Sequence, residues 1–263
     1  MDFKRKDRYT IDDLLDIMRI LRSPGGCPWD QEQTHQSIRN CLIEETYEAI
    51  EAIDNSDPEL LKEELGDVLL QVLFHSQLES EADSFDFSDV VDGIAKKMVV
   101  RHPHVFGDTV VSNSDEVLVN WDVIKKETKN QTTQTEVLQS VSKSLPSLMR
   151  SAKVQHKAAK VGFDWPDISG ALDKVEEETR ELKEAIASGS QDDRMEELGD
   201  LLFSAVNVSR FLNIEPEQAL SLSCDKFISR FQKMEQLAKE RGVDMNSSTL
   251  DGLNLLWNEA KAN

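Results

Sequence analysis

Two groups of acidic residues occur twice in this chain with the same internal spacing. The segments EETYEAIEAI at 44–53 and EELGD at 63–67 return as EETRELKEAI at 177–186 and EELGD at 196–200. Acids at this spacing on two neighbouring helices can hold a metal ion in a helical bundle. The candidate metal ligands are Glu45, Glu48, Glu64 and Asp67 in the first half, and Glu178, Glu181, Glu197 and Asp200 in the second, each pair 133 positions apart.

The helical spacing of these acids predicts their geometry. Residues three and four apart share one face of a helix, so Glu45 and Glu48 point the same way, as do Glu64 and Asp67 on the next helix. A short connection makes the two helices antiparallel, and the two acid pairs then face each other. Carboxylates at ~5 Å repel by about 3 kcal/mol per pair at an effective dielectric constant of 20. If this face is partly buried, it needs cations.

The ligand type limits the choice of metal. No histidine stands at a ligand position in either copy, and all-oxygen ligation suits hard ions, so we expect Mg²⁺, which Mn²⁺ can replace. The alternative is a solvated acidic face, the usual fate of glutamates on helices. Two copies with identical spacing favour the metal site. Glu44 and Glu177 lie about 100° around the helix from their neighbours and are expected outside the ligand set.

Glycines and histidines give further expectations. Gly66 and Gly199 stand at the same place in both EELGD segments. A glycine inside a helix costs about 1 kcal/mol relative to alanine, so the repeat predicts close backbone approach between helices, with a helix kink as the alternative. The histidines have no repeated counterparts and are expected to be structural or on the surface: His35, His75, His102, His104 and His156.

Basic and aromatic residues follow the acids in the same order in both halves. A Lys and an Arg lie one turn apart, and a Trp with a Lys four residues later comes near the end of each half. Each pair alone is typical of a solvated face or of core packing. Their joint repetition favours contacts to phosphates, and either stacking on a nucleobase or a role as a lid. The candidate substrate-binding residues are Lys97, Arg101, Trp121 and Lys125, and then Lys226, Arg230, Trp257 and Lys261.

The periodicity of apolar residues predicts an all-α fold. Apolar residues recur at steps of three and four almost throughout, and strand-like alternation is scarce. The repeat predicts two small helical bundles, a domain at 1–129, a polar linker at 130–140 and a domain at 141–263. We expect a first helix after the cap Thr10, and further helices near 36–54, 58–81, 87–101, 114–128, 143–159, 169–187, 191–212, 216–241 and 249–261.

Charge and composition restrict the partners. The 263 residues carry a formal charge of −20, and a polyanion such as nucleic acid is a poor partner for this surface. A small phosphate compound can still bind where metals invert the local charge. Three cysteines without a CxxC spacing fit a reducing compartment, so we expect the cytoplasm. No signal peptide or membrane-spanning segment is expected.

The motifs resemble those of the MazG family of nucleoside triphosphate pyrophosphohydrolases, within the all-α NTP pyrophosphatase superfamily. The resemblance rests on the two acidic motifs together with CPWDQEQT at 27–34, RHPHVFGD at 101–108 and GFDW at 162–165. It implies Mg²⁺-dependent hydrolysis of a nucleoside triphosphate to the monophosphate and pyrophosphate, with broad base specificity, in a homodimer. In that family the second half is usually credited with catalysis, which implies catalytic roles for Glu178, Glu181, Lys226 and Arg230.

Alternatives remain at this point. A narrower pyrophosphohydrolase, for dUTP or phosphoribosyl-ATP, would use the same acids. A non-enzymatic acidic bundle that binds divalent metal is a third possibility, although it would not need cations beside its ligands. No glycine-rich phosphate loop supports a P-loop mechanism. The general base is open among Glu178, Glu181 and Glu184, and the motif does not tell which copy works.

Overall fold

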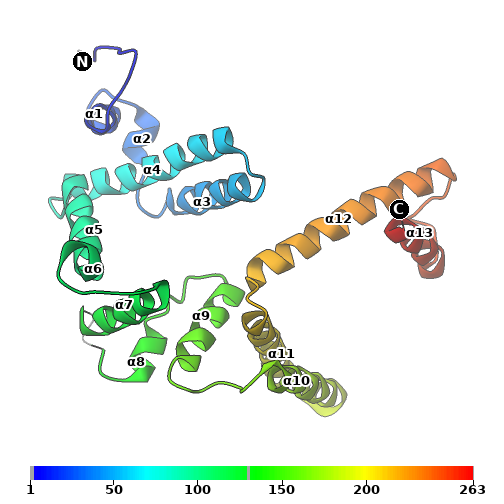
Figure 1. Cartoon of the computed structure of the whole chain (residues 1–263). Helices are drawn as coiled ribbons and strands as arrows, with labels where there is room; N and C mark the ends of the chain where they lie inside the picture. The colour runs from blue at the N-terminus through cyan, green and yellow to red at the C-terminus, as the bar shows by residue number, and fades with distance from the viewer. Residues whose placement is uncertain (1–2, 129–130, 263) are drawn as a thin grey trace. The chain divides into compact units, whose positions relative to one another are not determined.

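Helices form every regular element in the described part of the chain, residues 3–128 and 131–262 of a computed structural model (Figure 1). The all-α prediction is therefore confirmed. The elements are α1 Ile11–Arg22, α2 Pro28–Glu32, α3 Arg39–Asp54, α4 Pro58–Glu81, α5 Phe87–Arg101, α6 Pro103–Phe106, α7 Ser114–Thr128, α8 Gln134–Gln139, α9 Ser147–Ala159, α10 Ile168–Ser188, α11 Gln191–Phe211, α12 Pro216–Glu240 and α13 Leu250–Ala262.

The chain forms two compact units, Met1–Lys125 and Lys126–Asn263. In the first unit, α3 and α4 pack as an antiparallel hairpin (Figure 1). Asp57 caps α4 by accepting hydrogen bonds from the backbone N–H groups of Glu59 and Leu60, which satisfies two donors that the first turn leaves open. A core of Met18, Ile38 and Phe74 joins α1 and the start of α3 to α4.

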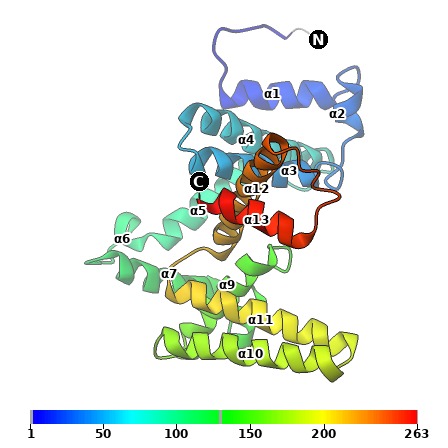
Figure 2. The ribbon, with the colours of Figure 1, turned by 90° about the vertical axis from the view of Figure 1, so that its right-hand side faces the viewer.

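The second unit repeats the hairpin with α10 and α11, which lie side by side in Figure 2. Ser190 and Asp193 form a capping box at the start of α11, so the turn between the helices is short and fixed. Helix α9 packs on α11, where the Gln155 side chain donates to the carbonyl of Phe203 at 2.7 Å. A separate apolar cluster, made by Met234, Ala238, Leu256 and Ala260, holds α12 against α13.

Three short helices, α2, α6 and α8, fall where no helix is expected. Helix α8 lies inside the segment 130–140 that the sequence predicts as a polar linker. Thr133 and Glu136 form a capping box there, and Val137 is buried. A single buried side chain is too little to give an apolar period, which explains why the pattern misses this helix.

The expectation of close backbone approach at the two repeated glycines is wrong within this chain. A Cβ atom built on Gly66 or Gly199 would meet nothing within 4 Å, and both positions are exposed. The glycines therefore do not serve packing between α3 and α4 or between α10 and α11. In the described residues, no helix combines the length and apolar character that crossing a bilayer requires.

Candidate metal and nucleotide site

The first acidic group lies on the facing sides of α3 and α4. Glu45 and Glu48 come from α3 and Glu64 from α4, and one carboxylate oxygen of each lies within 4.8 Å of the others. Glu64 is the most buried of the three, with 8% of its surface exposed. Asp67 lies outside this trio, but its charge helps to raise the pKa of Glu45.

The second acidic group repeats this geometry on α10 and α11. Glu178, Glu181 and Glu197 again offer carboxylate oxygens within 4.8 Å of one another. Here Glu178 is the buried member, only 3% exposed. Asp200 is exposed and lies outside the trio, although its charge acts on Glu197. The structure thus brings together three of the four predicted ligands in each copy.

Burial and mutual repulsion make these carboxylates hard to ionise together. Burial, followed by the charges of Asp67 and Glu48, raises the pKa of Glu45. The pKa of Glu64 is raised mainly by burial and then by Glu48 and Asp67. Burial also raises the pKa of Glu197 in the second copy, with repulsion from neighbouring acids added to it. A cation between the acids would relieve this repulsion, and the all-oxygen donor set fits a hard divalent ion.

Lys174 is a site residue that the sequence reasoning missed. Its Nζ atom lies 2.6 Å from Oε1 of Glu178 and 3.0 Å from Oε1 of Glu177. These hydrogen bonds, Glu178 first, raise the pKa of the Lys174 ammonium. Glu177, expected outside the ligand set, holds this ammonium instead. The signal was available, because a lysine four residues before a helical glutamate shares its face.

The predicted phosphate-binding residues of the second half lie on α12 and α13. Lys226 and Arg230 are on α12, while Trp257 and Lys261 are on α13. Trp257 packs against the ring of Phe227, with 5.0 Å between ring centroids. Helix α12 makes its extensive contacts with α9 and α13. Among the described residues, the more extensive contacts of α12 thus do not include α10 or α11, which carry the acids.

In the first half, the aromatic candidate lies in a small cluster of basic and aromatic residues. The ammonium of Lys125 lies 5.7 Å from the ring centroid of Trp121, and the ring of His102 meets the same indole edge-on at 5.0 Å. The indole Nε1 is buried and makes no hydrogen bond. Arg101 and the exposed Lys97 are on α5, which ends just before His102.

Two histidines join the segment before α3 to α4. Nδ1 of His35 lies 2.7 Å from Nδ1 of His75, and Nε2 of His35 lies 2.9 Å from a carboxylate oxygen of Glu79. The rings stack with 5.0 Å between centroids. These contacts fit the structural role expected for both histidines.

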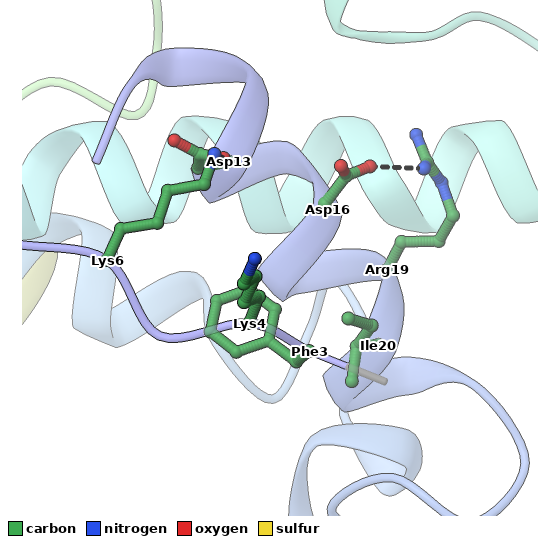
Figure 3. A pocket seen from close by; sticks show the side chains of 7 residues that line it. All are labelled: Phe3, Lys4, Lys6, Asp13, Asp16, Arg19 and Ile20. Atoms are coloured by element: carbon green, nitrogen blue, oxygen red, sulfur yellow. Dashed lines mark hydrogen bonds and ion pairs between the residues drawn. The ribbon is translucent and has the colours of Figure 1, made fainter. Parts of the chain in front are cut away.

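A shallow pocket elsewhere in the first unit contains none of the predicted site residues. It lies between the N-terminal segment around Phe3 and helix α1, and Figure 3 shows Asp16 and Arg19 paired at its rim, 2.7 Å apart. Its lining combines basic and acidic side chains with two apolar ones. These residues do not form a group of carboxylates like those on the two hairpins.

Comparison with known proteins places these acidic hairpins in a family. The MazG nucleotide pyrophosphohydrolase domain matches the chain twice, at residues 33–106 and 169–234. The chain belongs to the MazG family. It is 44% identical over 252 residues to the nucleoside triphosphate pyrophosphohydrolase/pyrophosphatase MazG of Thermotoga maritima, covering 95% of each chain.

Two further relatives show how far the likeness extends. The nucleoside triphosphate pyrophosphohydrolase of Escherichia coli is 42% identical over 256 residues, which cover 95% of this chain and 97% of that protein. The Bacillus subtilis protein YabN is 50% identical over 246 residues, and the match spans 50% of its length. Both matches run through both acidic hairpins of this chain, because they cover more than nine-tenths of it.

Proposed function

We propose that this chain hydrolyses nucleoside triphosphates to the monophosphate and pyrophosphate with Mg²⁺, which Mn²⁺ can replace. The observation that carries the proposal is the pair of three-carboxylate groups inside the two segments that match the MazG domain. Relatives named as nucleoside triphosphate pyrophosphohydrolases support the reaction. We also infer broad base specificity and a cytoplasmic location, where the free thiols of Cys27, Cys41 and Cys224 would stay reduced.

In the proposed mechanism, the acids of the second copy hold the ion and one of them moves a proton. When bound, Mg²⁺ would offset phosphate charge and make a water easier to deprotonate. The carboxylate of Glu178 or Glu181 accepts the water proton, because both lie in the trio. Glu184 is a weaker candidate for the base, since its carboxylate is outside the trio.

The basic residues have the complementary task. Lys226 and Arg230 would bind the triphosphate and stabilise the charge that develops on the leaving pyrophosphate. Trp257 and Lys261 would cover the nucleobase end. Asp200 would complete the ligand set from its exposed position on α11. In the first copy the same roles fall to Lys97, Arg101, Trp121 and Lys125, with Asp67 as the fourth ligand.

We further propose that two copies of the chain associate. Leu65 and Leu69 on α4 are exposed, and their counterparts Leu198 and Leu202 on α11 are exposed as well. The repeated glycine lies within each of these apolar stretches, with open space around it. Large apolar side chains beside a position without a side chain form a surface that another helix can approach closely. The proposed partner is a second copy, because both halves carry this surface.

The product pattern tests the reaction. Chromatography of a reaction with ATP should show AMP and pyrophosphate, and both should disappear in excess chelator and return with Mg²⁺ or Mn²⁺. ADP with orthophosphate as first products would reject the proposed reaction, and full activity in chelator would reject the metal requirement. A panel of triphosphates that includes dUTP and phosphoribosyl-ATP distinguishes broad specificity from a narrow enzyme.

A further inference from the structure

The two acidic groups differ in the charge beside them. In the second copy, the Lys174 ammonium contacts the buried carboxylate of Glu178 at 2.6 Å and that of Glu177 at 3.0 Å. The residue at the same place in the first copy is Cys41, on α3 and four residues before Glu45. A thiol in place of an ammonium brings no positive charge to the first group.

Among the described residues of the first copy, no other cation takes the place of the ammonium. Across the residues that the structure describes, no Lys or Arg forms an ion pair with Glu45, Glu48 or Glu64, and the nearest ion pair on α4, between Lys62 and Glu59, is exposed. The first group thus has no ion pair of this kind, while the second has the Lys174 ammonium 2.6 Å from Glu178 and, more loosely, the Arg180 guanidinium 4.0 Å from Glu181.

The contact of Lys174 with Glu178 is within one helix, which keeps the two side chains within reach of each other. Both residues are on α10, one turn apart, so their proximity does not depend on how α10 packs against other helices. Glu178 is 3% exposed, and a pair with one buried member is screened less by solvent than an exposed pair. A divalent ion that binds Glu178 must displace the ammonium or accept its repulsion.

We infer that Lys174 is a positioning residue that weakens metal binding by the second copy when no nucleotide is present, whereas Cys41 leaves the first copy as the tighter metal site. This inference rests on the proposed metal-dependent function and deepens it. The chain then has two classes of metal site despite identical acids, and the main determinant is the residue four positions before the first acid of each trio, because Lys174 makes the closer contact there and Arg180 lies 4.0 Å from Glu181.

Titration of the full-length protein with Mn²⁺ alone, followed by the electron paramagnetic resonance signal of the free ion, tests the inference. Each copy is observed in a chain whose other copy is silenced, by Glu45→Gln with Glu64→Gln or by Glu178→Gln with Glu197→Gln. The test variants are Lys174→Met, which removes the charge at similar length, and Cys41→Lys, which introduces it. Lys174→Arg and Cys41→Ser are the matched controls, and circular dichroism checks helix content.

The first copy should bind Mn²⁺ about tenfold more tightly than the second, the scale of one charge interaction near solvent. Lys174→Met should raise the affinity of the second copy about tenfold, and Cys41→Lys should lower that of the first by a similar factor. Both controls should change little. Unchanged or weaker binding in Lys174→Met overturns the inference while leaving the metal site in place. Absence of Mn²⁺ binding at both copies overturns the inference together with the proposed metal-dependent function.

Discussion

At the level of single residues, the two copies are alike in their acids and different in which acid is buried. Glu64 is the buried member on α4, whereas Glu178 is the buried member on α10. Water replaces a buried carboxylate as a ligand less readily than an exposed one, so its removal should affect a bound ion more than removal of an exposed acid. The catalytic copy is therefore best identified by substituting a buried acid of one trio and the acid at the matching position of the other copy.

We expect Glu178→Gln to lower kcat for ATP by at least about hundredfold at saturating Mg²⁺. The reason is that loss of a residue that binds the metal itself should cost more than loss of a residue that only hydrogen-bonds to a metal ligand. Glu45→Gln, the same change at the matching position of the first copy, should leave a substantial part of the rate. Steady-state kinetics on both purified variants, with circular dichroism as the control for folding, checks this. A dead Glu45→Gln beside an active Glu178→Gln would reverse the assignment, and a loss of about half in each would mean two independent sites.

At the level of elements, α4 is held to its neighbours by polar contacts as well as by the core. Arg22 of α1 forms two hydrogen bonds with the carboxylate of Glu81, at 2.8 and 2.7 Å, and its guanidinium lies 5.2 Å from the ring centroid of Phe74. The contact with Arg22 lowers the pKa of Glu81. The Arg22 side chain is 6% exposed, so this pair is less screened than the surface pairs of the same helix.

Glu81→Gln should lower the free energy of unfolding by about 1 kcal/mol at pH 7, a value reduced from that of a buried pair because Glu81 itself is partly in solvent. Because its pKa is lowered on folding, this contribution is present above the unfolded pKa and is lost as the pH falls through the folded value. The difference between variant and wild type in urea unfolding should therefore shrink from pH 7 towards pH 3. Glu59→Gln is the control, since its pair with Lys62 is exposed, and an equal effect there would contradict the role of burial.

The stacked histidines predict a second pH dependence. Burial, with a smaller contribution from the charge of His35, lowers the pKa of His75 below its usual value near 6.5. The folded protein therefore favours neutral His75, and the stability of the first unit should fall as the pH drops below about 6.5. Urea unfolding between pH 7.5 and 5 should show a smaller decline in His75→Gln than in wild type. An identical decline would assign the effect to other groups.

At the level of the whole molecule, the proposed catalytic groups are spread over two helix pairs. The acids belong to α10 and α11, while Lys226 and Arg230 are on α12, which packs on α9 and α13. Helix α12 also exposes apolar side chains, among them Leu222, Phe227 and Ile228. If two copies associate as proposed, one copy can supply α12 to the acids of the other.

A mixing experiment tests this arrangement. Glu178→Gln lacks the acid and Lys226→Met lacks the cation, so each variant alone should lose most activity. Mixed subunits that exchange should regain up to about a quarter of the wild-type rate, because one intact site forms in half of the dimers. Sedimentation must show a dimer in both variants. A mixture that stays as inactive as its parts would mean that each chain completes its own site.

The sequence by itself determined the helical class, most helices and the two acidic groups. These features follow from local rules, because apolar steps of three and four define a helix face and acids three apart share it. The short connections at Asp57 and Ser190 made the antiparallel hairpins predictable, and with them the meeting of Glu45, Glu48 and Glu64. Helix α8 was missed because one buried valine gives no periodic pattern of apolar residues.

Only the tertiary structure decided which of the predicted site residues lie close together. It left Asp67 and Asp200 outside the trios, gave the repeated glycines open space, and gave α12 its extensive contacts with α9 and α13 rather than with the helices that carry the acids. Such outcomes depend on burial and on contacts between helices, and spacing along one helix says nothing about them. The pair of Lys174 with Glu178 is different, because both residues lie on α10 and their spacing of four already places them on one face. The sequence recorded that position 41 differs from position 174, but only the ion pair gave the difference a physical meaning.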